Sequence, residues 1–460
     1  MSETSFPPKK LLVFLPLFVV LCLQPGCTDA RPLTVRMAGD EWFLDSLTNT
    51  QLIVDFEKQS GIHVEVLHKN DRTIMSDLDH GSSSASEGLD VVVVRHRLLG
   101  ALVQKGLVQP IDSFLSDPAL HDASFVPQQQ LFQNWWHELS SYGSKVYGYP
   151  FTSLTTFLCY RKDLLDDPAN QRNFKVRYHR DLKPPVSWDE YLRLAEFFNH
   201  PEQHFYGTYI QGKQGLALWY EWLNLIYSFR GNILDNQHGW EYGDIVINSP
   251  QNVAATQQYV KLTKFSPPDT RKYGWGEAQS SLQQGHVFMG LLWNDQAHFL
   301  EDPKVSKVAG KIGYSLIPAN SPQPPDSFSQ LEGLTYLIPT QSKHPCEAYR
   351  FIEWAMSAGV QVQQALTGSA SARKTTYDDA RIKTIPYTAT FLASVPVARP
   401  KPTIPESAQM TEAMERRVFE IVNGQTSPQA GLDSLALDLQ QILGDKGKLR
   451  YPVKAPTASK

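Results

Sequence analysis

The apolar and polar positions first form a regular pattern at residues 33–38, where leucine, valine and methionine alternate with polar residues. Such alternation predicts a β-strand. Gly39 and Asp40 then form a predicted turn into one helix, which continues through residues 52–56. Gly61 ends this helix, because glycine readily adopts the conformation that terminates helices. This part of the chain therefore predicts a strand followed by a helix.

Two further strands follow in the same part of the chain. Residues 62–66 again alternate apolar and polar side chains. Asp90 is followed by a continuous valine run to Val94, which is typical of a strand buried on both faces of a parallel sheet. Strands that alternate with helices predict an α/β layer architecture.

The middle and the end of the chain carry strong signals for helix starts. Ser187 and Glu190 have the spacing of a capping box, in which each side chain bonds the other residue's backbone amide. Ser-Pro pairs at 249–250 and 427–428 each predict a helix with serine at its N-cap and proline in its first turn. From Gly444 onward, the composition predicts a frayed tail.

The N-terminal segment has the features of an export signal. Two lysines precede an apolar run at residues 11–23, which is shorter than the roughly 20 apolar residues of a membrane-spanning helix. Gly26 before Cys27 resembles the bacterial lipoprotein box. This sequence departs from the box at Gln24, where an aliphatic residue is usual. We therefore expect a lipoprotein-type signal peptide over residues 1–27 with lipidation of Cys27; cleavage without an anchor is the alternative.

Composition and charge indicate a folded protein that does not bind nucleic acid. The chain has 460 residues, of which 42% are hydrophobic and 20% charged, and this length favours two lobes over one compact core. A formal net charge of −4 offers no basic surface for phosphate groups. Of the 4 cysteines, Cys22 and Cys27 fall in the signal, and the sequence leaves open whether Cys159 and Cys346 pair.

No constellation of residues predicts an enzyme, a metal site or a cofactor. Residues 207–213 match the first seven positions of a P-loop, but Gln214 replaces the residue that binds magnesium, so a surface loop is the better interpretation. The chain has no nucleophile elbow, zinc-protease helix or dinucleotide-binding glycine motif. We expect no catalytic residue, no metal and no cofactor.

Tryptophan gives the positive signal, since several of the 10 tryptophans lie where an apolar segment gives way to polar residues. Trp42 follows the first predicted strand, and Trp293 ends the apolar run 287–292. In α/β sheets, ligands bind outside the carboxyl ends of the strands. A tryptophan face can stack on a sugar while neighbouring acidic and amide groups bind its hydroxyls. Three tryptophans at apolar helical spacing are instead expected in the core: Trp188, Trp222 and Trp354.

Several motifs occur in a fixed order along the chain. They occupy residues 56–65, 89–93, 106–111, 145–151, 159–164, 185–190, 284–293 and 337–345. The most diagnostic pair is Gly-Tyr-Pro at 148–150 and Tyr-Arg-Lys-Asp-Leu at 160–164, where Arg161 replaces the usual asparagine. In this order the motifs resemble family 1 extracellular solute-binding proteins, the maltose-binding-protein-like subunits of bacterial ABC importers.

The resemblance implies an α/β fold of the type II periplasmic-binding-protein kind, with two discontinuous lobes joined by a hinge. The implied boundaries are 28–152 plus 318–360 for lobe 1, 153–317 plus 361–447 for lobe 2, and 448–460 for a flexible tail. Closure of the lobes buries the ligand in such proteins, and the closed state is what the membrane permease recognises.

The position of the family's cleft also implies a set of ligand-binding residues. They are Asp40, Glu41, Trp42, Arg95, His96, Tyr149, Trp219, Trp275, Trp293, Asn294, Asp295, Glu332, Gly333 and Arg373. The implied function is that of a monomeric periplasmic or outer-face subunit that captures a sugar or polyol and delivers it to ABC permease subunits. Three alternatives stay open: a charged solute such as glycerol phosphate, a polyamine or a metal ion; a carbohydrate-active enzyme; and a membrane sensor as partner.

Overall fold

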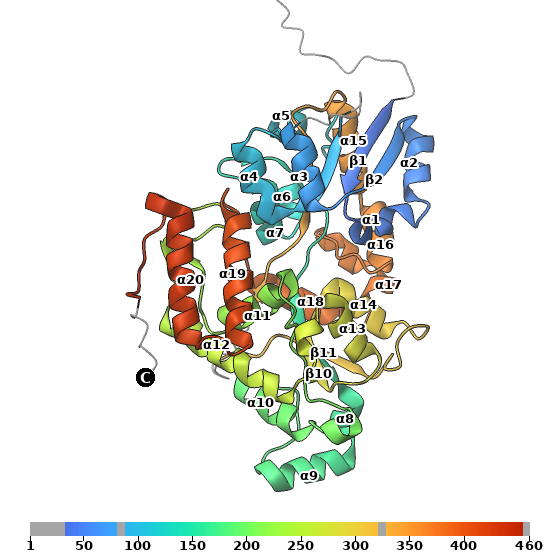
Figure 1. Cartoon of the computed structure of the whole chain (residues 1–460). Helices are drawn as coiled ribbons and strands as arrows, with labels where there is room; N and C mark the ends of the chain where they lie inside the picture. Colours follow the sequence, from blue (N-terminus) through green and yellow to red (C-terminus); the bar gives the residue numbers. More distant parts are fainter. Residues whose placement is uncertain (1–32, 81–87, 321–327, 454–460) are drawn as a thin grey trace, which may run out of the picture. The chain divides into compact units, whose positions relative to one another are not determined.

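The computed structural model describes residues 33–80, 88–320 and 328–453 (Figure 1). The predicted export signal, including Cys27, lies outside these ranges. Within them the chain is mixed α/β, and two main sheets organise it.

The first main sheet has five strands in the order β2-β1-β3-β13-β6. β1 is parallel to β2 and β3, whereas β13 is antiparallel to β3 and β6. The strands are β1 (Thr34–Gly39), β2 (His63–His68), β3 (Val91–Arg95), β6 (Gly148–Pro150) and β13 (Leu334–Leu337). The strands predicted at 33–38, 62–66 and 90–94 are confirmed, and the four valines of β3 are fully buried, as a central strand requires.

Short helices accompany this sheet. They are α1 (Glu41–Thr48), α2 (Leu52–Ser60), α3 (Asp71–His80), α4 (Leu99–Gln104), α5 (Asp112–Leu115), α6 (Pro127–Gln130) and α7 (Gln133–Ser140). The prediction of one helix up to Gly61 was wrong, because α1 and α2 are separate. The Thr50 hydroxyl donates to the Leu47 carbonyl at 2.9 Å and accepts from the Leu52 amide at 3.4 Å, so its side chain replaces helical backbone bonds.

The second main sheet has three antiparallel strands in the order β10-β7-β11. These strands are β7 (Thr156–Arg161), β10 (Met289–Trp293) and β11 (Ile312–Ser315). The helices in this part of the chain are α8 (Lys162–Asp166), α9 (Pro168–Tyr178), α10 (Trp188–Phe197), α11 (Leu216–Ser228), α12 (Pro250–Leu262), α13 (Trp275–Gln283) and α14 (Asn294–Glu301). The capping box of Ser187 and Glu190 starts α10, and Ser249 caps α12, as predicted.

Six helices follow β13. They are α15 (Pro345–Ala355), α16 (Ala358–Leu366), α17 (Ala380–Lys383), α18 (Thr388–Ser394), α19 (Ser407–Val422) and α20 (Pro428–Leu443). Helices α19 and α20 lie side by side, and α19 also packs on α11 (Figure 1). Three strand pairs are short: β4 (Ser141–Tyr142) with β5 (Lys145–Val146), β8 (Leu234–Asp235) with β9 (Asp244–Ile245), and β12 (Ser329–Gln330) with β14 (Ala398–Arg399).

The start of the predicted C-terminal tail pairs with β9. The Ile245 amide donates to the Lys448 carbonyl at 2.7 Å, and the Arg450 amide donates to the Ile245 carbonyl at 3.1 Å. The Arg450 guanidinium also pairs with Asp235 and Asp244 of the β8–β9 hairpin. Backbone bonds therefore join this part of the predicted tail to β9.

Three connections of the chain meet between the two main sheets. Leu154, between β6 and β7, donates its amide to the Glu332 carbonyl at 2.8 Å, and the Glu332 amide donates back to the Leu154 carbonyl at 3.0 Å. The Ser153 amide donates to the carbonyl of Ala370 at 2.8 Å. These bonds bring segments far apart in the sequence to one place.

The structure answers two questions about Cys159 and about the P-loop-like segment at residues 207–213. Cys159 on β7 is buried and carries a free thiol, so it does not pair with Cys346. The P-loop-like segment is not a surface loop, since residues 207–212 are buried. Within it, the Gln211 amide donates to the Glu221 carboxylate at 2.8 Å.

Glu221 on α11 is a buried carboxyl without a cation partner among the described residues. Burial raises its pKa to about 7, although the hydroxyl of Tyr259 and the groups of Gln211 donate to the carboxylate and oppose this shift. A carboxyl whose pKa is higher in the folded chain than in the unfolded chain favours folding while it is protonated. Its contribution is complete below the unfolded pKa of about 4.3 and is lost as the pH rises through about 7.

We predict that Glu221→Gln removes a pH-dependent component of about 3 kcal/mol from the free energy of unfolding between roughly pH 4.5 and pH 8. Chemical denaturation at both pH values measures it. The control is Glu412→Gln, which changes an exposed carboxyl on α19 and should keep the natural pH dependence. Equal pH dependence in Glu221→Gln and the natural chain would contradict the prediction.

Candidate ligand-binding site

A cavity of about 380 Å³ lies at the carboxyl ends of strands from both main sheets. Asp40 directly follows β1, Arg95 ends β3 and Trp293 ends β10. Leu154 and Glu332, from the connections that meet between the sheets, complete the lining. Ligands of α/β proteins bind at such strand ends, and the volume is within the range of small-molecule sites.

Aromatic side chains dominate the lining of this cavity. Trp42 and Phe43 come from α1, whereas Tyr220, Trp275 and Trp293 come from α11, α13 and β10. The Tyr220 ring meets the Trp293 ring edge-on at 5.4 Å between centroids and stacks on the Trp275 ring at 6.3 Å. Aromatic surface from segments of both main sheets therefore borders one space, and such faces suit the C–H faces of a small polar molecule.

Charged groups of both signs interrupt the aromatic lining. The Nη1 atom of Arg95 lies 3.0 Å from Oδ2 of Asp71, and its Nη2 atom lies 3.9 Å from Oδ2 of Asp40. Burial lowers the pKa of Arg95, but the Asp71 carboxylate outweighs burial and keeps the guanidinium charged. Burial also raises the pKa of the Asp295 carboxyl, against the hydrogen bond that it accepts from Trp42. These groups can donate to and accept from a polar ligand.

The Trp42 indole bridges the cavity. Its Nε1 atom donates to Oδ2 of Asp295 at 3.3 Å, and its ring lies 5.4 Å from the Phe299 ring. A second cavity of about 350 Å³ shares Trp42, Phe43, Leu154 and Asp295 with the first. Trp42, which is 48% exposed, therefore contributes to the walls of both cavities.

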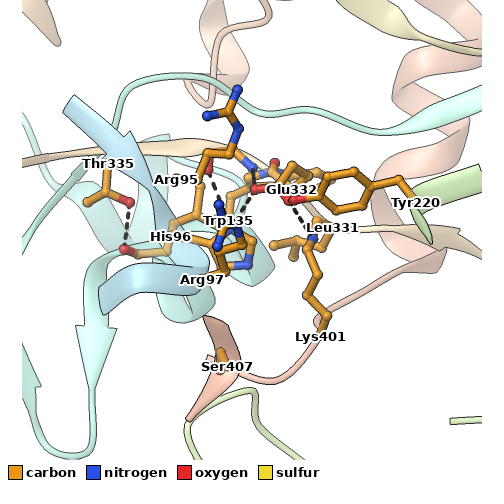
Figure 2. Close-up of polar contacts among 12 residues, drawn as sticks. Arg95, His96, Arg97, Trp135, Tyr220, Leu331, Glu332, Thr335, Lys401 and Ser407 are labelled. Carbon is orange, nitrogen blue, oxygen red and sulfur yellow. Dashed lines mark hydrogen bonds and ion pairs between the residues drawn. The ribbon is translucent and has the colours of Figure 1, made fainter. Parts of the chain in front are cut away.

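Glu332 lines the cavity. It receives donors from several segments (Figure 2). The His96 Nδ1 atom lies 2.8 Å from Oε1 of Glu332, and the Gly333 amide donates to the same oxygen at 2.9 Å. The Tyr220 hydroxyl donates to Oε2 at 2.5 Å, and Lys401 Nζ lies 2.7 Å from this oxygen. The carboxylate therefore joins the end of β3, helix α11 and the segment after β14.

This cluster is removed from water. The Lys401 side chain is 0% exposed and that of Glu332 is 4% exposed. Burial alone raises the pKa of Glu332, but the Lys401 ammonium and the His96 ring outweigh it and hold that pKa well below its usual range. Lys401 also donates to the Leu331 carbonyl at 2.9 Å and lies 5.0 Å from the centre of the Tyr220 ring. A buried charge pair with additional hydrogen bonds of this kind is stable only as a complete set.

Seven of the fourteen residues predicted to bind ligand line the cavity. They are Asp40, Trp42, Arg95, Trp275, Trp293, Asp295 and Glu332. The other seven do not line it: Glu41, His96, Tyr149, Trp219, Asn294, Gly333 and Arg373.

Three of these seven lie beside the cavity. Glu41 is exposed in the first turn of α1, where a carboxylate oxygen lies 3.8 Å from His68 Nδ1. His96 lies behind Glu332 and is fully buried. At Gly333 an added Cβ would lie 2.2 Å from the Thr152 carbonyl oxygen, so this residue allows close backbone contact.

The other four residues have structural contacts. The Tyr149 hydroxyl lies in the core, 3.2 Å from the Tyr349 hydroxyl. Trp219 is buried next to Tyr220, with 4.6 Å between ring centroids. Asn294 bonds the backbone of the β6–β7 connection, and Arg373 donates to the Met356 carbonyl at 2.8 Å.

The prediction missed Phe43, Leu154, Tyr220, Gly276, Gln279 and Gln296. Helical spacing could have found Gln279, which lies one turn after Trp275 on the same face of α13. Phe43 and Tyr220 each follow a predicted tryptophan; Phe43 lines the cavity together with Trp42, whereas Tyr220 lines it in place of Trp219. No sequence signal separates these positions from core aromatics.

We predict that Lys401→Met lowers the free energy of unfolding by about 3 to 5 kcal/mol, because it leaves the Glu332 carboxylate buried without its cation. Denaturant unfolding measures the change. Adding Glu332→Gln to this variant should restore part of the loss, since the uncompensated charge is removed. Lys272→Met, at an exposed position, is the control and should change stability by less than about 0.5 kcal/mol. Natural stability in Lys401→Met would rule out a dependence on this ion pair.

Solved structures with the same fold cover most of the chain. An ABC transporter solute-binding protein from Agrobacterium radiobacter K84 in complex with ribitol has a TM-score of 0.75 and 23% identity, over 89% of this chain and 98% of that one. One from Thermotoga lettingae TMO bound to α-D-tagatose has a TM-score of 0.73 and 21% identity, over 90% and 99%. Maltose-bound MalE3 of T. maritima has a TM-score of 0.71 and 20% identity, over 89% and 100%. These likenesses confirm the predicted type II periplasmic-binding-protein fold with two discontinuous lobes.

Relatives found by sequence have a similar level of identity and cover a smaller part of the chain. A binding protein of Brucella abortus (strain 2308) is 22% identical over 366 residues, which are 78% of this chain and 81% of that protein. A periplasmic-binding protein of Sinorhizobium fredii, assigned to an amino-acid ABC transporter, is 24% identical over 271 residues, 58% of this chain and 59% of that protein.

The family model for bacterial extracellular solute-binding proteins matches residues 51–390. In the part of the chain that the structure describes, no helix has the length and apolar character needed to cross a bilayer. The family resemblance predicted from the ordered motifs is confirmed, and the chain belongs to the bacterial extracellular solute-binding protein family.

Proposed function

We propose that this chain captures a sugar or polyol in the cavity at the strand ends and delivers it to the permease subunits of an ABC importer. The observation that carries the proposal is the joint lining of this cavity by Trp42, Trp275 and Trp293 with carboxylates and an arginine between them. Aromatic faces stack on the C–H faces of a sugar, while charged and amide groups bind its hydroxyls.

The chemistry of the lining favours an uncharged polyhydroxyl solute. The lining contains one basic residue, Arg95, and three carboxylates, which belong to Asp40, Asp295 and Glu332. An anionic solute would therefore be repelled by the excess of carboxylates. Arg95 is itself paired with Asp71 and does not offer a free charge to a phosphate. Ribitol, tagatose and maltose are the solutes in structures of similar fold, and a molecule of this size fits about 380 Å³.

The proposed mechanism is closure of two lobes around the solute. The resemblance implies residues 28–152 plus 318–360 for lobe 1 and 153–317 plus 361–447 for lobe 2, and we place the hinge at the crossing of Leu154 and Glu332. The Gln364 side chain donates to the Ser46 hydroxyl at 3.1 Å, so we move the last crossing to a point after α16. The bond from Trp42 to Asp295 would then join the lobes across the cavity.

Binding without catalysis is part of the proposal. Both oxygens of Glu332 are already occupied by donors, which leaves this carboxylate unsuited to the proton transfer of a glycosidase. Family membership also points to transport. We therefore propose that the protein acts as a monomer at the outer face of the membrane, anchored through Cys27, and that a permease rather than a sensor recognises its closed state.

Thermal-shift screening followed by calorimetry tests the class of solute. We expect one or more sugars or polyols to raise the unfolding temperature, because a ligand that binds only the folded state stabilises it. The panel also contains glycerol phosphate, polyamines, divalent cations and amino acids. A shift with one of these classes and with no saccharide or polyol would contradict the sugar proposal.

With the solute identified, we predict that Trp293→Ala weakens binding by about 1 to 3 kcal/mol, or roughly 5- to 150-fold, because a stacking surface is lost. Titration calorimetry gives the two dissociation constants. Trp354→Ala is the matched control, since Trp354 packs on Phe56 and Phe351 and does not line the cavity. Unchanged affinity in Trp293→Ala would assign Trp293 to the core alone.

A further inference from the structure

A second group of side chains, outside the solute cavity, has the composition of a metal site. It consists of His137 and Glu138 on α7 and His238 in the β8–β9 hairpin. Each residue can offer one ligand atom, and these atoms lie within 4.8 Å of one another. It is the one such group of histidine, cysteine and carboxylate side chains among the described residues.

Glu138 is a buried carboxylate whose described side-chain partner is a histidine ring rather than a Lys or Arg. The residue is 6% exposed and has no Lys or Arg partner among the described residues. It accepts from the Gly239 amide at 3.1 Å, and its Oε1 atom lies 2.9 Å from Nδ1 of His238. Buried carboxylates normally pair with a cation or bind a metal, because leaving their charge uncompensated is costly. A positive ion bound at this position would therefore stabilise the Glu138 carboxylate.

The contact between His238 and Glu138 is slightly shorter than the separation between two ligands of a metal ion. Zinc bonds to imidazole nitrogen and carboxylate oxygen are about 2.0 to 2.2 Å long, so two ligands of a tetrahedral ion lie roughly 3.0 to 3.5 Å apart. A cation can replace the proton that Nδ1 of His238 and Oε1 of Glu138 share at 2.9 Å. The two side chains then have to separate by a few tenths of an ångström, a small adjustment for a histidine that is only half-buried.

The backbone of the hairpin holds His238 in place. The Asn236 side-chain amide donates to the carbonyls of His238 and Glu241, at 2.9 Å each. The Glu241 carboxylate accepts from the amides of Gln237 and His238, at 3.2 and 3.1 Å. Such support around a ligand residue limits the conformational freedom that binding would otherwise remove.

His137 supplies the third ligand from an exposed position. Among the described residues its ring has only stacking contacts, with the rings of His238 at 4.8 Å and of Trp240 at 4.9 Å. Both ring nitrogens are thus without a hydrogen-bond partner in the described structure. A rotation of this exposed side chain can turn either nitrogen toward the shared site.

We propose that His137, Glu138 and His238 form a binding site for a divalent transition-metal ion, with zinc as the ion that the ligands fit best. The two imidazoles are borderline ligands, which favour zinc, copper and nickel over calcium and magnesium, and two histidines with one carboxylate are a known ligand set of zinc. Three protein ligands leave a fourth position of a tetrahedral ion for water. The ion joins α7 to the β8–β9 hairpin and neutralises the buried Glu138 carboxylate.

Titration calorimetry with zinc chloride tests the site on the full folded chain after treatment with EDTA. We expect one Zn²⁺ to bind per chain, and we expect Co²⁺ to give the strong visible absorption of a four-coordinate ion. Lack of zinc binding would overturn the proposal, as would a cobalt spectrum of a fully hydrated six-coordinate ion.

Substitution of the ligands locates the ion. His137→Ala changes an exposed ring only and should weaken zinc binding about 10- to 100-fold, and His238→Ala should do the same. His204→Asn is the control, because it removes an exposed imidazole while asparagine tolerates the φ of 54° at that position. Circular dichroism and thermal unfolding without metal check that the variants fold. Natural zinc affinity in a folded His137→Ala protein would overturn the assignment.

Discussion

The buried carboxylate of Glu332 is the interaction on which the arrangement of the site depends. It lies where two connections between the main sheets pair through Leu154, and its oxygens take hydrogen bonds and charge from His96, Tyr220 and Lys401. A carboxylate removed from water must have such partners, because its lost hydration is otherwise uncompensated. One side chain therefore fixes the end of β3, helix α11 and the segment after β14 relative to each other.

The solute cavity follows from this arrangement. Because the strands of both main sheets end near the crossing, the side chains that follow those ends converge on one space. Tyr220 has two roles: its hydroxyl donates a hydrogen bond to Glu332, and its ring packs against Trp293 and Trp275. The aromatic lining and the buried cluster around Glu332 therefore belong to one network of contacts. Trp42 adds an indole N–H that donates to Asp295.

Helix α7 connects the solute cavity with the proposed metal site. Trp135 on this helix donates its indole N–H to the Glu332 carbonyl at 2.8 Å, and His137 and Glu138 lie two and three residues further along the helix. On the hairpin side, the Thr403 amide donates to the Gly239 carbonyl at 2.7 Å, two residues from Lys401. Both sites are therefore in contact with helix α7 and with the segment that follows β14, so the same two segments support them.

The sequence by itself determined the local elements. The capping box at Ser187 and the left-handed glycine at Gly61 involve only neighbouring residues, and the valine run of β3 has a composition typical of a buried strand, so the pattern predicted all three. The order of motifs also predicted the family. The break between α1 and α2 was missed because it depends on the Thr50 hydroxyl, whose competition with the backbone leaves no periodic signal.

Only the tertiary structure decided which polar and aromatic residues face the cavity. Trp219 and Tyr220 are neighbours on one helix, yet only Tyr220 lines the cavity, because the packing of α11 sets the direction of each side chain. Lys401 gave no signal in the sequence, since its partner Glu332 is far away along the chain. Helix caps and helix ends depend on adjacent residues, so the sequence predicts them. Burial and charge pairing depend on contacts between distant segments, so they are set only when the chain folds.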